Sequence, residues 1–106
     1  MNREHLCFVY GSLMKGESNH RLLRRARFAG AAHTRCSFTL VDLGAFPGLI
    51  AGGTSAVRGE TYAVGDATLA SLDRLESHPT FYRRQEIALS DGTRVQAYRR
   101  PLDCDG

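Results

Sequence analysis

The chain has 106 residues, of which 42% are hydrophobic and 24% are charged, as in an ordinary globular domain. At this length we expect one domain with one core, and a core of that size needs neither a disulfide nor a metal to hold it. The formal net charge of +3 is too small an excess to indicate a nucleic-acid partner.

The cysteines and the N-terminal residues indicate a reducing compartment. Cys7, Cys36 and Cys104 show no C-x-x-C spacing, so we expect neither a zinc site nor a disulfide framework. The apolar run at 6–9 is too short for a signal-peptide core or a membrane span. The sequence therefore predicts a cytoplasmic protein that does not bind a membrane.

The N-terminal third predicts a strand, a loop and a short helix. Residues 6–10 (LCFVY) form an apolar run typical of a buried strand, and a Gly-Ser pair ends it. A loop is expected over 13–18. Asn19 is a candidate N-cap for a short helix through Arg27, with its apolar residues inward and its arginines outward.

The middle of the chain is expected to add strands and turns. One or two strands are predicted within 28–43, where β-branched and aromatic residues occur. Glycine and proline predict turns at 44–48 and 52–53. The alternation of residues over 56–64 predicts a further strand.

The last third predicts the clearest elements. A helix is expected over 67–77, with Asp66 as its N-cap and a His-Pro pair at its end.

A hairpin is expected over 82–100. A three-residue turn with Gly92 in the left-handed region would pair Ile87 with Val95, apolar to apolar. The two-residue alternative would pair Ile87 with Gln96. Strands thus outnumber helices, which favours an α+β domain with a curved or partly closed sheet.

Glu76 is the candidate catalytic residue. Leu69, Leu72 and Leu75 mark the apolar stripe of the predicted helix, and Glu76 follows Leu72 by four residues, which places it on the face expected to be buried. Burial and the negative end of the helix dipole both disfavour an ionised carboxyl, so its pKa should exceed the usual value of about 4.3. Such a glutamate is typical of a proton-transfer residue. The alternative is a glutamate that turns to solvent or pairs with a neighbouring arginine: Arg74, Arg83 or Arg84.

The second candidate is the turn Tyr10-Gly11-Ser12-Leu13. Backbone N–H groups at the end of a strand can point into a cavity and hold an anion. The alternative is an ordinary strand-ending turn.

Other polar residues give weaker signals. The histidines His20 and His78 have no acidic cluster nearby, so no metal site is expected. No G-x-S-x-G signature of a nucleophilic serine is present. A basic stretch has no aromatic platform beside it and is interpreted as a solvated helix face: Arg21, Arg24, Arg25 and Arg27.

Three segments together resemble the gamma-glutamylcyclotransferase family. Residues 8–13 (FVYGSL), followed by 16–20 (GESNH), resemble the family's opening Y-G-[ST]-L…G…N-H motif. Residues 57–62 (VRGETY) resemble its V-x-G-E-x-Y strand, and 72–84 resemble its L-D-x-[LF]-E-G-x-P-x-x-Y-x-R segment. The short chain is closer to the gamma-glutamylamine cyclotransferase branch. One departure is Ser77-His78, where the family usually has a glycine after the glutamate.

The resemblance implies a fold and a reaction. The fold would be α+β, a small mixed β-barrel flanked by helices, with residues 1–106 as one gamma-glutamylcyclotransferase-like domain. In the reaction the free α-amine of a gamma-glutamyl group would attack its own γ-amide carbonyl, giving 5-oxoproline and a free amine without a cofactor.

The resemblance also implies roles for individual residues. Glu76 would move the protons, and the backbone of residues 10–13 would bind the substrate's α-carboxylate or the oxyanion. Tyr82 and Tyr98 would be pocket walls and hydroxyl donors, whereas Glu60 would be structural.

The identity of the released amine stays open: an amino acid, a lysine side chain, a polyamine or an aminoglycoside-like compound. The oligomeric state also stays open. The alternative function is a non-catalytic small-molecule or protein-binding module on the same fold. A distant third is an RNA-binding barrel, which only the arginines favour.

Overall fold

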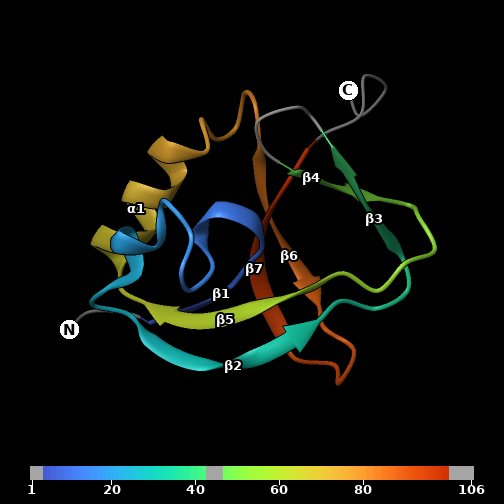
Figure 1. Ribbon diagram of the computed structural model, residues 1–106, viewed down its shortest axis with the longest axis horizontal. Coiled ribbons are helices and arrows are strands. Elements are labelled where there is room, and N and C mark those ends of the chain that lie inside the picture. Colours follow the sequence, from blue (N-terminus) through green and yellow to red (C-terminus); the bar gives the residue numbers. More distant parts are fainter. Residues whose placement is uncertain (1–3, 43–46, 101–106) are drawn as a thin grey trace.

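The computed structural model describes residues 4–42 and 47–100. Within these ranges seven strands, one α-helix and two 3-10 helices follow one another along the chain (Figure 1). In order they are β1 (His5–Val9), η1 (Gly11–Leu13), η2 (His20–Leu23), β2 (Arg27–His33), β3 (Phe38–Asp42), β4 (Pro47–Ala51), β5 (Arg58–Val64), α1 (Asp66–Leu75), β6 (Arg83–Ala88) and β7 (Arg94–Arg99).

Five of the strands form a mixed sheet in the order β2-β5-β1-β7-β6. The central strand β1 pairs antiparallel with β5 and parallel with β7. Both of its faces are covered: Cys7 and Val9 pack in the cluster that contains Leu72 of α1, whereas Phe8 packs in a second cluster with Leu49 of β4. Burial on both faces explains why β1 is a continuous apolar run rather than an alternating one.

The predicted α+β class and mixed sheet are confirmed, but a closed barrel is not. In Figure 1, β2 and β5 run across the direction of β6 and β7, so the sheet is strongly twisted. Its edges approach at one end only, where Thr34 forms an isolated bridge with Leu89 and Ser90 N–H donates to His33 O at 3.0 Å.

A separate two-stranded sheet joins β3 to β4. Of the one or two strands predicted within 28–43, the structure has two, β2 and β3, and β2 begins one residue earlier, at Arg27. The turn predicted at 44–48 is wrong at its C-terminal end, because Pro47 and Gly48 begin β4, and residues 44–46 lie outside the described residues. Proline is tolerated at the first position of a strand, so its presence did not exclude one.

The short helix predicted from Asn19 to Arg27 is also wrong. Only the 3-10 turn η2 forms, and Arg27 already belongs to β2. Asn19 makes no capping bond. Its side chain instead donates to Ser12 Oγ at 2.9 Å. The apolar residues expected inward do face the core, with Leu23 buried.

The helix α1 begins one residue earlier than predicted, at Asp66, and ends two residues earlier, at Leu75. Gly65 is its N-cap, and Asp66 lies in the first turn, where its carboxylate pairs with His5 rather than capping the helix. At the C-terminus the chain leaves the helix through Ser77, whose φ is 53°. Ser77 therefore adopts the left-handed conformation that glycine most readily provides.

The hairpin agrees with the prediction in register and in turn. Ile87 lies opposite Val95, and both side chains are buried. Gly92 has φ of 89°, the left-handed position that a three-residue hairpin turn requires.

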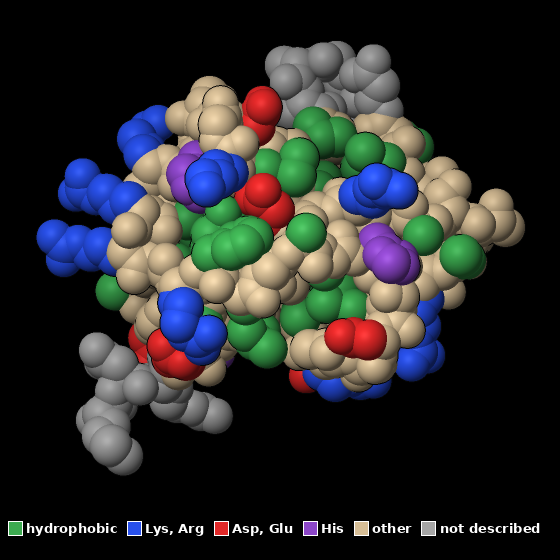
Figure 2. All heavy atoms as spheres, turned by 60° about the horizontal axis from the view of Figure 1, so that its bottom comes forward, with side chains coloured by type: hydrophobic (Ala, Val, Ile, Leu, Met, Phe, Trp, Pro, Cys, Tyr) green, Lys and Arg blue, Asp and Glu red, His purple; other side chains and the backbone are tan. Residues whose placement is uncertain are grey.

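The exterior is mixed in character. On the face shown in Figure 2, apolar side chains gather in several separate groups between charged ones. Within the described residues, no helix is both long and apolar enough to cross a membrane.

Candidate active site

A cavity of about 370 Å³ opens where the C-terminal ends of β1 and α1 meet the start of β4. Its described lining is mostly apolar and aromatic, which is usual for a small-molecule site. The lining residues are Phe8, Val9, Tyr10, Ser12, Leu13, Asn19, Pro47, Leu75, Glu76, Ser77, Phe81, Tyr82 and Tyr98. Six of the seven site residues predicted from the sequence are therefore brought together, and only Gly11 is not part of the wall.

Glu76 is the only charged side chain in this described lining. It is the C-cap residue of α1 and is half-buried. Burial raises its pKa to about 7, in the direction predicted from the sequence. Within the described residues no hydrogen bond or ion pair holds the carboxyl; in particular Arg84 binds Asp73 and Arg74 binds Ser71 instead.

Leu75 departs from the buried apolar stripe predicted for the helix. Leu69 and Leu72 are buried as expected, but Leu75 is 40% exposed and lies at the cavity. The apolar stripe thus runs from the core into the cavity wall, and Glu76 continues it there.

Three tyrosines belong to the aromatic wall, and each hydroxyl is already bonded within the protein. The Tyr10 hydroxyl donates to Tyr98 O at 2.5 Å and accepts from Leu49 N–H at 3.1 Å. The Tyr82 hydroxyl donates to Pro47 O at 2.6 Å, and the Tyr98 hydroxyl donates to the Asp73 carboxylate at 2.5 Å. As pocket walls, Tyr82 and Tyr98 lie where predicted, but both hydroxyl hydrogens are engaged by protein acceptors.

The turn at residues 10–13 forms the 3-10 helix η1, which lies against the cavity. Within the described part of the chain, no acceptor is found for the N–H groups of Gly11, Ser12 and Leu13. Gly11 has φ of 73°, and a Cβ there would lie 2.8 Å from Pro47 Cγ. Glycine is thus required by conformation and by contact with β4, and not by open cavity space.

Two side chains from the following segment brace this turn. Asn19 bonds Ser12 Oγ, and His20 Nδ1 lies 3.0 Å from Leu13 O. Glu60 on β5 accepts from Lys15 N–H at 2.9 Å and from the Tyr62 hydroxyl at 3.0 Å. These two bonds agree with the structural role predicted for Glu60.

Sequence reasoning did not assign several lining residues, among them Asn19, Pro47, Ser77 and Phe81. Asn19 could have been predicted as a site residue, because it belongs to the segment that resembles the family's N-H motif. Pro47 and Phe81 could not, since their places at the cavity depend on the pairing of β4 and on the loop after α1.

The comparisons with known proteins agree with this geometry. The sequence model of the family described as "Gamma-glutamyl cyclotransferase, AIG2-like" matches residues 7–101. The chain belongs to this family. That stretch contains the cavity lining and all three segments on which the resemblance was based.

Individual relatives extend the same finding. A Vibrio cholerae protein with a provisional gamma-glutamylcyclotransferase name is 49% identical over 85% of this chain and 77% of its own length. A Bos taurus protein named gamma-glutamylaminecyclotransferase is 38% identical over 92% of this chain, which spans 61% of the bovine protein. The crystal structure of a Mus musculus AIG2-like protein has a TM-score of 0.83 and 31% identity, covering 92% of this chain and 77% of the mouse chain.

Proposed function

We propose that the protein is a gamma-glutamylcyclotransferase that converts a gamma-glutamyl amine or amino acid into 5-oxoproline and the free amine. The observation that carries the proposal is Glu76, a half-buried carboxyl whose pKa burial raises to about 7, in a cavity whose described walls hold no other charge. Family membership and the bovine relative's name support the reaction class.

The reaction needs little from the protein besides orientation and proton transfer. The α-nitrogen forms a bond to the γ-carbon of the same glutamyl group, and the bond from that carbon to the leaving nitrogen breaks. Because nucleophile and electrophile belong to one molecule, a cavity that holds the folded-back conformer removes much of the entropic barrier.

Glu76 serves both proton transfers in this proposal. As a carboxylate it accepts a proton from the α-ammonium, which frees the attacking amine, and it delivers that proton to the departing nitrogen. After the attack the ring nitrogen loses a second proton to the same carboxylate, which passes it to the released amine, so the amine leaves as an ammonium ion and Glu76 is again a carboxylate. A group whose pKa lies near the working pH is suited to both steps. Activity should therefore rise as the pH passes through about 7.

The turn at residues 10–13 is proposed to bind the negative charge of the substrate. The N–H groups of Gly11, Ser12 and Leu13 are assigned to the α-carboxylate or to the oxyanion that forms on the γ-carbonyl. The rings of Tyr82 and Tyr98 pack against the glutamyl chain.

A substrate screen with product analysis tests the proposal. Gamma-glutamyl amines and amino acids are incubated with the protein, and mass spectrometry identifies the product; 5-oxoproline is expected. Matched N-acetyl compounds should not react, because their α-nitrogen cannot attack. Glu76→Gln should lose most turnover while it stays folded.

Two results would contradict the proposal. Glutamate as the primary product, with N-acetyl substrates also cleaved, indicates hydrolysis. Saturable binding of gamma-glutamyl compounds without turnover indicates a binding module on the same fold. The cytoplasmic location stays a prediction from the sequence.

A further inference from the structure

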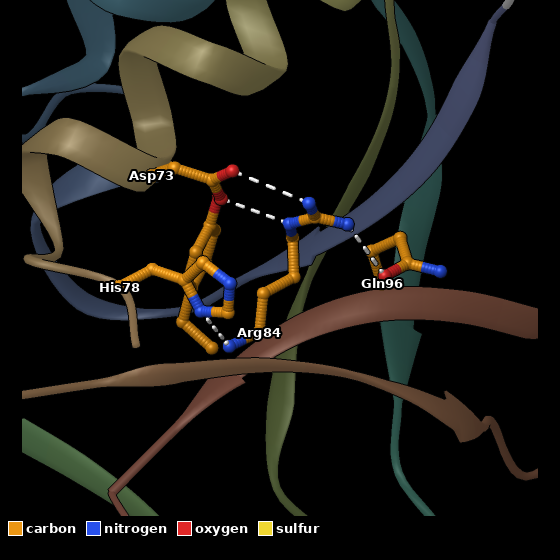
Figure 3. A network of polar contacts seen from close by, with 5 residues as sticks. Asp73, His78, Arg84 and Gln96 are labelled. Carbon is orange, nitrogen blue, oxygen red and sulfur yellow. Dashed lines mark hydrogen bonds and ion pairs between the residues drawn. The ribbon is translucent and has the colours of Figure 1, made fainter. Parts of the chain in front are cut away.

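Arg84 on β6 joins the sheet to the last turn of α1 (Figure 3). Its Nε and Nη2 atoms donate to the two carboxylate oxygens of Asp73 at 2.8 and 3.2 Å, and Nη1 donates to Gln96 Oε1 on β7 at 3.1 Å. The Asp73 carboxylate also accepts from the hydroxyl of Tyr98, which lines the cavity. A two-point contact of guanidinium with carboxylate fixes orientation as well as distance.

The main chain of Arg84 holds the same segment at a second point. Its N–H donates to His78 Nδ1 at 2.9 Å, as Figure 3 also shows, and the His78 N–H donates to Asp73 O at 2.9 Å. Hydrogen bonds therefore join each of three residues to the other two: Asp73, His78 and Arg84. Residues 73–84 form a loop whose two ends meet at Arg84.

Glu76 lies inside this loop. Its carbonyl accepts from Tyr82 N–H at 3.2 Å, and the carbonyl of Ser77 accepts from the N–H groups of Thr80 and Phe81 at 2.8 and 2.9 Å. The Glu76 carboxyl has no polar partner of its own among the described residues. Since an ionised carboxyl is more stable in water than in an apolar cavity, only the backbone of this loop keeps it there.

We propose that Arg84 is a positioning residue that holds Glu76 in the cavity by closing the loop of residues 73–84 onto α1. The inference rests on the proposed function for its kinetic consequences. Arg84 does not line the cavity and takes no part in proton transfer; its contribution is the geometry of the carboxyl.

The pair acts through geometry and not through its charges. Burial is what raises the pKa of Glu76. The titratable groups that face it are the phenols of Tyr10 and Tyr82, whose own pKa values burial and the Glu76 charge raise, and the phenol of Tyr98 in the same wall. Loosening the loop should therefore lower the pKa of Glu76 by letting water reach it.

A charge-neutral double variant tests this reasoning. Asp73→Asn combined with Arg84→Gln removes one negative and one positive charge, so the net charge is unchanged. We expect kcat to fall about 10- to 100-fold, as for a misplaced catalytic group, with KM changed less than about 3-fold. The acid limb of the pH–rate profile should move to lower pH.

Two further single variants serve as a control and as an intermediate case. Arg83→Gln is the matched control, because Arg83 is adjacent on β6 and no polar partner is found for its side chain within the described ranges. Its kcat and the acid limb of its pH–rate profile should equal those of the native protein. Arg84→Lys keeps the charge but loses the two-point contact, and should lie between native and double variant in both readouts.

A measurement without substrate separates this inference from the proposed function. The carboxyl carbon of Glu76, assigned by its loss in Glu76→Gln, is titrated by NMR; the midpoint should be near 7 in the native protein and should fall toward 4.5 in the double variant. A native midpoint in a folded double variant, or a loss of kcat without movement of the acid limb, overturns the positioning role. If the double variant does not fold, an unshifted midpoint in Arg84→Lys overturns it. A shifted midpoint in a protein that makes no 5-oxoproline supports the positioning role and rejects the reaction.

Discussion

Replacing Glu76 with glutamine should change how the free energy of unfolding depends on pH. Burial raises the folded-state pKa of this carboxyl from 4.5 to about 7. The group therefore contributes stability that is fully present below the unfolded-state pKa and is lost as the pH rises through the folded-state pKa. At about 1.4 kcal/mol per pKa unit, the loss across this window is about 3 kcal/mol. Glu76→Gln has no proton to lose and should show none of it.

Urea unfolding of both proteins at about pH 5 and about pH 8 measures this effect. Part of the loss has already occurred at pH 5. From pH 5 to pH 8 the native protein should therefore lose about 2 kcal/mol of its free energy of unfolding relative to Glu76→Gln. Glu86→Gln is the control, because Glu86 is exposed. A native-minus-variant difference that stays constant within about 0.5 kcal/mol would refute the burial of the Glu76 carboxyl.

Three further substitutions test the walls of the site. Gly11→Val should lose about 1–3 kcal/mol of stability and also affinity for a gamma-glutamyl ligand, because its Cβ would meet Pro47 at a positive φ. Thermal melting measures the loss of stability, and titration calorimetry measures the loss of affinity. Native affinity in a folded variant would contradict the proposed role of the turn. Tyr98→Phe removes the hydrogen bond to the Asp73 carboxylate and should lower the free energy of unfolding, measured with urea, by about 1.5–3 kcal/mol. Ligand affinity should stay within about 3-fold of the native value because the ring remains. Ser77→Gly should raise the melting temperature. Removing the strain of a serine in the left-handed conformation contributes about 1–2 kcal/mol, which exceeds the cost of the extra entropy that glycine gives the unfolded chain, about 0.4–1 kcal/mol. Ser77→Ala should not raise it, because alanine keeps the strain.

The features that the sequence predicted well depend on neighbours close along the chain. The hairpin register that pairs Ile87 with Val95 follows from alternation and from Gly92 at a three-residue turn. The cavity position of Glu76 follows from its spacing to Leu72 on one helix. In both cases a few consecutive residues determine the geometry, and local rules of period and turn are sufficient.

The features that it missed depend on partners far along the chain. Strand β4 begins at Pro47 and exists because β3 pairs with it, although its local sequence indicates a turn. Asn19 was expected to cap a helix, but Ser12 across the opening loop takes its side chain. The bond from the Tyr10 hydroxyl to Tyr98, 88 residues away, has no local signal at all.

Those long-range bonds also determine which group in the cavity can exchange protons. Burial raises the pKa of Tyr82 to about 12 and raises the pKa values of Tyr10 and Tyr98 as well. Each phenol also donates its hydrogen to an acceptor of the protein, so none is released near neutral pH. Among the described lining residues Glu76 alone gains and loses a proton in that range. A reaction that begins and ends at an amine needs one group of that kind, and further titrating groups in the wall would compete for the same proton.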